Sequence, residues 1–183
     1  MTKSPLLFTY NMVSLLEPEK IINQIPIEEH FPSADFGCGA GGFTIPLARR
    51  SLKGLVYAFD IQDTVLSALQ GNATSQGLNN IKAAKCDLEA PSATGIPANS
   101  LDLIIIVNVL FQAEHADLVL KEAARIIKPG GMIVIVDWKK DVPFGPNARI
   151  SLQETQDILR RLDVKLKHEI EAGTYHWGAI FGK

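Results

Sequence analysis

A run of small residues between two regular segments constrains this chain more than any other feature. Residues 33–44 read SADFGCGAGGFT, and five of the six positions from 37 to 42 carry no side chain larger than a methyl group: Gly37, Gly39, Ala40, Gly41 and Gly42. Removing side chains in this way lets another group approach the backbone closely. A short strand pattern precedes the run and a helical pattern follows it. We therefore expect a glycine loop that joins a strand to a helix and leaves room for a ligand.

Strand and helix patterns alternate along the chain. We expect strands at residues 32–36, 55–61, 81–86, 101–110, 132–138, 164–171 and 175–181, and helices at 18–25, 43–53, 63–77, 115–128 and 151–162. This alternation predicts an α/β fold, a doubly wound, mostly parallel seven-stranded sheet with helices on both faces and a C-terminal antiparallel hairpin strand. In helix 115–128, Val119 and Ala123 mark the expected buried face, and Lys121 and Glu122 the solvated one. Residues 1–183 then form a single domain, with residues 1–30 as an N-terminal helical lid.

Polar side chains fall at or near the carboxyl ends of the first four expected strands. They are Asp35, Asp60, Asp87 and Asn108. In an open parallel sheet, ligands bind beyond these strand ends, at the point where the strand order reverses. Polar residues of an ordinary surface would not recur at the same end of four successive strands. We therefore expect the four side chains to converge on one crevice.

The glycine spacing alone leaves two classes of nucleotide ligand open. Gly37, Gly39 and Gly42 fit the G-x-G-x-x-G dinucleotide fingerprint, and Asp60 stands where an acid would bind ribose hydroxyls. Asp35, however, would face a pyrophosphate at close range, and like charges about 4 Å apart repel by roughly 4 kcal/mol at an effective dielectric of about 20. A ligand with an ammonium and a sulfonium group would gain from this carboxylate. We therefore expect a cationic nucleoside in place of a dinucleotide.

The composition is that of an ordinary soluble domain and argues against several other functions. The formal net charge is −2 and the basic residues are scattered, so nucleic acid is an unlikely partner. The longest apolar run, residues 101–110, is too short to cross a bilayer, and the N-terminus lacks the apolar core of a signal peptide. We expect a cytoplasmic protein without a membrane partner. Cys38 and Cys86 are too far apart for a zinc site, so we expect two small buried residues and no metal.

Taken together, the motifs resemble those of the class I S-adenosylmethionine-dependent methyltransferases. The matching parts are the D-x-G-x-G-x-G run at residues 35–41, the acid of YAFDI, the pair Asp87-Leu88, and LDLIIIVNVL followed by a helix and KPGGMIVIVDW. The similarity covers about residues 32–183 and is greatest for the small-molecule branch of the family. It implies one S-adenosylmethionine-binding methyltransferase domain, with S-adenosylmethionine as cofactor, that transfers a methyl group in line to a small molecule.

The resemblance also implies nine cofactor-binding residues. They are Asp35, Gly37, Cys38, Gly39, Asp60, Ile61, Asp87, Leu88 and Asn108. The first four would surround the methionine portion of the cofactor. Asp60 would accept hydrogen bonds from both ribose hydroxyls while Ile61 packs on the adenine. Asp87 and Leu88 would contact the adenine edge, and Asn108 would lie near the reacting methyl group.

The sequence identifies no catalytic residue. The fourth expected strand ends in Asn108-Val109-Leu110-Phe111. It lacks the Asn-Pro-Pro-aromatic run that is typical of the family members that methylate amino groups of amides and bases. Substrate-side candidates, each of which also fits an ordinary solvated or packed residue, are Tyr10, His115, Asp137, Lys139, Lys140, Asp141, His176 and Trp177. The loop VPFGPNAR and the N-terminal segment are expected to cover a small, partly apolar acceptor. An NAD-dependent oxidoreductase and a non-catalytic nucleoside-binding protein remain as alternatives, and the acceptor and the oligomeric state stay open.

Overall fold

The structure is a computed structural model and describes residues 16–183, so Tyr10 and the first half of the expected lid lie outside the described residues. The strands are β1 (Ser33–Phe36), β2 (Val56–Asp60), β3 (Ile81–Lys85), β4 (Leu101–Val107), β5 (Ile127–Trp138), β6 (Lys165–Ile170) and β7 (His176–Gly182). The helices are α2 (Pro18–Ile22), α3 (Thr44–Arg50), α4 (Asp63–Ser75), α5 (Ala116–Ile126) and α6 (Leu152–Arg160).

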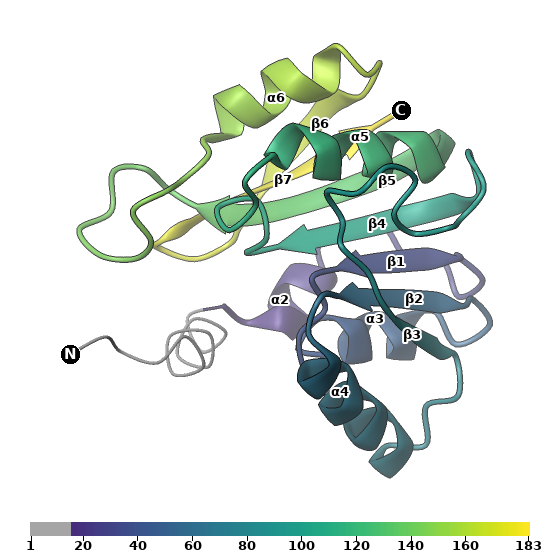
Figure 1. The fold of residues 1–183 in the computed structure, drawn as a ribbon. Helices are drawn as coiled ribbons and strands as arrows, with labels where there is room; N and C mark the ends of the chain where they lie inside the picture. Colours follow the sequence, from purple (N-terminus) through teal and green to yellow (C-terminus); the bar gives the residue numbers. More distant parts are fainter. Residues whose placement is uncertain (1–15) are drawn as a thin grey trace.

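The strands form one seven-stranded sheet in the order β3-β2-β1-β4-β5-β7-β6 (Figure 1). The first five strands of the chain pair in parallel, and β7 lies antiparallel between β5 and β6. The expected doubly wound α/β fold with a C-terminal antiparallel hairpin is therefore confirmed. The strand order reverses between β1 and β4, which places the crevice for a ligand at their carboxyl ends.

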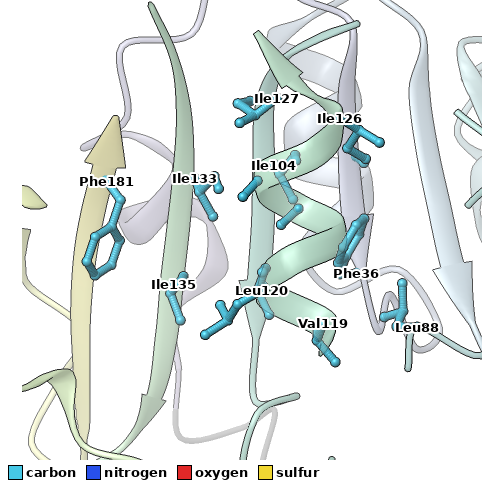
Figure 2. Packing of buried hydrophobic residues seen from close by; sticks show 14 of the residues in the cluster. Phe36, Leu88, Ile104, Val119, Leu120, Ile126, Ile127, Ile133, Ile135 and Phe181 are labelled. Carbon is cyan, nitrogen blue, oxygen red and sulfur yellow. The ribbon is translucent and has the colours of Figure 1, made fainter. Parts of the chain in front are cut away.

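Helices cover both faces of the sheet. On one face, α5 packs on the inward side chains of the central strands, as with Val119 and Leu120 against Ile104 and Phe36 (Figure 2), and α6 packs against α5, β6 and β7. On the other face, α2 and α3 bury residues such as Ile22 and Leu47, and α4 packs against β2 and β3. The core thus lies in two layers, one on each side of the sheet.

The central strand β1 is short but completely buried. All four of its residues are buried, including the polar residues Ser33 and Asp35, which in an exposed strand would face solvent. They are buried because β1 pairs on both sides, with Asp35 opposite Ala58 on β2 and Ile105 on β4. Position in the sheet therefore outweighs the weak strand propensity of this segment.

Some boundaries differ from those expected. The β5 strand begins at Ile127 instead of Met132, because Ile127 already pairs with Leu101 and the register then shifts before Met132 pairs with Leu103. The β4 strand ends at Val107, three residues earlier than expected. The expected capping box of Ser151 and Glu154 at the start of α6 is confirmed.

Candidate functional site

A cavity of about 730 Å³ opens at the carboxyl ends of the first four strands. Its volume is within the range of small-molecule sites. All nine residues implied by the sequence line it: Asp35, Gly37, Cys38, Gly39, Asp60, Ile61, Asp87, Leu88 and Asn108. The fold thus brings together residues from four separate strand ends, as we expected from their position at the end of each strand.

The glycine loop forms one wall of this cavity. The backbone N–H groups of Gly37 and Cys38 both donate to the carbonyl of Phe59, at 2.8 and 2.9 Å, which fixes the loop to the end of β2. Gly37 has a φ of +72°, and a Cβ at this position would overlap the side chain of Val109. The loop after β4 can therefore pack against the glycine loop only while residue 37 has no side chain.

Asp60 bridges the glycine loop and the end of β2. Its Oδ2 accepts the Gly39 N–H at 3.0 Å, and its Oδ1 accepts the Gln62 N–H, also at 3.0 Å. A carboxylate offers about four lone-pair positions, so each oxygen keeps room for a further donor. Ile61, beside it, is 58% exposed at the rim of the cavity.

Asp35 lies deeper in the cavity and is only 2% exposed. Its Oδ2 accepts a hydrogen bond from Thr44 Oγ1 at 2.5 Å. Burial raises the pKa of this carboxyl to about 7, and the nearby charge of Asp60 adds to the rise, whereas the bond from Thr44 opposes it. From the sequence we expect Asp35 to be ionised. With a pKa of about 7, however, the carboxyl is protonated in part of the molecules at neutral pH.

The loop after β3 forms the opposite wall and carries Glu89, a residue that was not assigned from the sequence. Asp87 Oδ1 accepts the N–H of Glu89 at 3.0 Å. The Glu89 carboxylate in turn accepts the N–H groups of Glu114 and His115, at 3.2 and 2.6 Å. Glu89 thereby joins the two loops that enclose the cavity. The sequence around Glu89 does not identify it as a site residue, because its partners lie 25 and 26 residues further along the chain.

Asn108 follows β4 in a left-handed conformation, with a φ of +56°. Its N–H donates to the carbonyl of Val136 at 2.9 Å, and Gln112 Nε2 donates to its carbonyl at 2.6 Å. Its side-chain Oδ1 is buried and has no hydrogen-bond partner among residues 16–183. An unpaired buried acceptor in a cavity wall is suited to a donor on a ligand.

Further residues complete the cavity lining. Those not assigned from the sequence include Leu16, Phe43, Gln62, Val65, Glu89, Val109, Gln112 and Ala113. Most of them are apolar or lie in loops, and their sequence patterns match those of ordinary core and loop residues. Only the fold shows that they face one space.

The substrate-side candidates that the structure describes do not line this cavity. Asp137 is fully buried, and its Oδ2 accepts the N–H groups of Leu110 and Phe111, so it supports the loop after β4. Lys140 forms an ion pair with Glu154 at 2.6 Å. The remaining candidates within the described chain, His115, Lys139, Asp141, His176 and Trp177, also lie outside the lining.

Both cysteines are free and buried in the cavity wall. Burial raises the pKa of both thiols, that of Cys86 to about 11, so neither is a thiolate at neutral pH. Among residues 16–183, no group of three or more His, Cys, Asp or Glu side chains could hold a metal ion. Over the same residues, every helix is too short or too polar to span a bilayer.

Comparison with known proteins agrees with this architecture. A family model for methyltransferase domains matches residues 27–177. A demethylmenaquinone methyltransferase of Geobacillus stearothermophilus is 28% identical over 68% of this chain and 53% of its own length. A tRNA N(3)-cytidine methyltransferase of Gallus gallus is 30% identical over 57% of this chain and 29% of its own length. The chain thus spans about half, or less, of these relatives.

A solved structure extends the likeness to the whole fold. The crystal structure of a SAM-dependent methyltransferase from Aquifex aeolicus superposes with a TM-score of 0.82 at 24% identity, covering 98% of both chains. At this identity the superposition establishes the fold, including the C-terminal hairpin and the strand order.

Proposed function

The chain belongs to the methyltransferase-domain family, among the class I S-adenosylmethionine-dependent enzymes, and we propose that it transfers the methyl group of S-adenosylmethionine to a small acceptor molecule. The observation that carries this proposal is the convergence of Asp35, Asp60, Asp87 and Asn108, from four strand ends, on one cavity. Their unused acceptor positions match the hydrogen-bond donors of this cofactor.

Each part of the cofactor has a complementary group in the cavity wall. The remaining lone pairs of Asp60 accept from the two ribose hydroxyls, and Ile61 covers one face of the adenine. Asp87 has one oxygen not used by Glu89, which accepts from the adenine amine beside Leu88. Asp35, Asn108 Oδ1 and the Gly37–Gly39 backbone surround the methionine portion. Its ammonium group donates to Asn108 Oδ1, which has no partner among residues 16–183, and to the Asp35 oxygen that does not accept from Thr44.

The chemistry requires positioning more than proton transfer. The cofactor supplies an electrophilic methyl group on a sulfonium, and the leaving thioether is neutral. Holding the acceptor atom in line with that methyl group supplies the acceleration, on the scale of effective molarities of roughly 10⁵ to 10⁸ M. The described cavity lining contains no His or Lys. Because its carboxylates Asp35, Asp60 and Asp87 are assigned here to the cofactor, we propose an acceptor atom that ionises readily by itself, such as a thiolate, a carboxylate, or an activated phenol or carbon acid.

The acceptor that we propose is small and partly apolar. The Geobacillus relative is named for a quinone acceptor, and the apolar lining by Leu16, Phe43 and Val109 is suited to a ring of that kind. We further propose that residues 1–30 cover the acceptor, which is supported by Leu16 in the cavity wall, and that the single domain works in the cytoplasm, which is supported by two free cysteines.

A transfer assay with radiolabelled S-adenosylmethionine tests this function. The full chain is incubated with panels of small phenols, hydroquinones, thiols and acids, and in parallel with total tRNA. We expect label to enter at least one small acceptor and not the tRNA. Labelling of tRNA alone would overturn the small-molecule assignment, since one relative is named for a tRNA substrate.

A further inference from the structure

Unpaired polar atoms are concentrated in one pair of residues outside the cavity lining. Of the five buried side-chain nitrogens and oxygens without a hydrogen-bond partner among residues 16–183, three belong to this pair: Trp138 Nε1, His176 Nδ1 and His176 Nε2. Both residues are 1% exposed. They are register partners on β5 and β7, and their rings lie 4.4 Å apart. A buried polar group without a partner lowers stability, so the pair is suited to a partner that the described part of the chain does not supply.

The pair lies near the cavity wall, although neither ring is part of the lining. Trp138 lies two residues beyond Val136 on β5, and Val136 is the register partner of Val107, which lines the cavity. Side chains two residues apart in a strand share one face, and two residues span about 7 Å. The backbone of Asn108 is also bonded to Val136. The Trp138–His176 pair therefore lies two residues along β5 and β7 from the strand position that is paired with the cavity wall at Val107.

A single loop lies over the indole ring. Phe144, which is 44% exposed, has its ring 6.0 Å from that of Trp138 and 4.5 Å from that of Tyr175. Gly145 has a φ of +114°, and a Cβ there would meet the indole at 2.7 Å, so the backbone lies flat on Trp138. The cover is therefore a surface loop next to an exposed ring.

That loop is organised around one guanidinium group. Arg149 donates to five backbone carbonyls, those of Lys139, Lys140, Val142, Phe144 and Pro146. The loop therefore has a defined shape without a regular element of its own. Arg149 holds the backbone on both sides of Gly145, so the part of the cover that is free to turn away from Trp138 is the side chain of Phe144, which is 44% exposed.

We propose that Trp138 and His176 form an acceptor subsite beside the cofactor cavity, which binds an aromatic ring bearing a hydroxyl group. This inference rests on the function proposed above. The indole N–H donates to the hydroxyl oxygen, and an imidazole nitrogen accepts the hydroxyl proton in a hydrogen bond. The apolar body of the ring takes the place of the Phe144 side chain against Trp138 and Tyr175.

The imidazole is in the right state for this role. Burial lowers the pKa of His176 to about 4, and the positive charge of Lys139 adds to the effect. At neutral pH the ring is therefore uncharged, with one nitrogen that accepts and one that donates. His176 acts here as a binding and specificity residue. Its low basicity makes it a poor proton acceptor for the transfer step itself.

The test compares 1-naphthol with naphthalene, which differs only by the hydroxyl group. Binding of each to the full chain saturated with S-adenosylhomocysteine is measured from the chemical shifts of the aromatic protons of the probe itself, which report binding equally in wild type and in every variant. Trp138→Phe and His176→Phe remove the proposed partners and keep an aromatic ring. Trp177→Phe is the matched control, since Trp177 lies next in the same strand as His176 and its Nε1 already donates to Ile150 at 3.0 Å.

We expect wild type and Trp177→Phe to bind 1-naphthol about tenfold more tightly than naphthalene, and Trp138→Phe and His176→Phe to lose that preference while still binding S-adenosylhomocysteine. Equal binding of the two probes by wild type, or a preference that survives in Trp138→Phe and His176→Phe, would overturn the subsite alone. A wild-type chain that ignores S-adenosylhomocysteine would overturn the proposed function, and the subsite with it.

Discussion

Glu89, which lines the cavity, and His115 are joined by a hydrogen bond of 2.6 Å, from the His115 backbone N–H to the Glu89 carboxylate. A second bond from the Glu114 N–H, at 3.2 Å, makes Glu89 a clamp between the loops after β3 and β4. Hydrogen bonds to a charged acceptor contribute about 1.5–3 kcal/mol. We expect Glu89→Ala to weaken S-adenosylhomocysteine binding about tenfold or more, and Glu89→Gln to weaken it less, as measured by calorimetric titration.

The matched control for the clamp is Glu114→Ala. It removes the same charge from the loop after β4 but keeps the Glu114 N–H, and the Glu114 side chain makes no hydrogen bond within residues 16–183. Its affinity should equal that of wild type. The clamp would be contradicted if Glu89→Ala and Glu114→Ala bound the ligand equally well.

Gly37→Ala should be strongly destabilising. The left-handed backbone costs an alanine about 1 kcal/mol, and the added methyl group overlaps Val109, so we expect the free energy of unfolding to fall by about 2 kcal/mol or more. Gly71→Ala is the control, because Gly71 lies within α4 with open space around its Cβ, and it should stabilise by up to about 1 kcal/mol. Urea denaturation measures both. Equal stabilities would show that Gly37 is not required for packing.

The affinity for S-adenosylhomocysteine should rise with pH through about 7. The pKa of Asp35 is about 7 in the free protein, chiefly because of burial, and only the ionised carboxylate attracts the ligand's ammonium group. Between about pH 6 and about pH 8 the ionised fraction, and so the affinity, should increase several-fold. Asp35→Asn should bind more weakly, with a flat profile. A profile that keeps its slope in Asp35→Asn would assign the titration to another group.

Asp137 should make folding stability depend on pH. Burial raises its pKa to about 7 even though it accepts three backbone N–H groups, from Leu110, Phe111 and Trp138. The folded protein then keeps a proton that the unfolded chain loses at the ordinary aspartate pKa of 3.8, so the free energy of unfolding falls as pH rises from about 4 through about 7. Asp35 contributes with the same sign. Urea denaturation over this range should show a smaller slope in Asp137→Asn, and an unchanged slope would contradict the assignment.

Local chemistry explains why much of the site could be predicted from the sequence. The glycine loop and the acids at the strand ends can be recognised from short stretches of sequence. The loop is identified by its glycines alone, and the carboxyl ends of parallel strands all lie at the same edge of the sheet. All nine assigned residues therefore meet in one cavity. Their individual roles toward the cofactor remain predictions.

Residues whose partners are distant in the sequence could not be placed in this way. Glu122 was expected on the solvated face of its helix, but it is 4% exposed, because Thr94 from the preceding loop donates to it and Arg125 pairs with it. Its pKa is lowered by these partners against the effect of burial. The pairing of Trp138 with His176 likewise depends on the register of β5 and β7, which no local pattern specifies.

The most direct test of the account is calorimetric titration of the full chain with S-adenosylhomocysteine and, separately, with NADH. We expect S-adenosylhomocysteine to bind and NADH to give no heat of binding. Asp60→Asn should weaken the S-adenosylhomocysteine affinity by about ten- to a hundredfold, because we propose that Asp60, which also accepts the N–H groups of Gly39 and Gln62, accepts hydrogen bonds from the ribose hydroxyls. A chain that retains NADH and ignores S-adenosylhomocysteine would contradict the account.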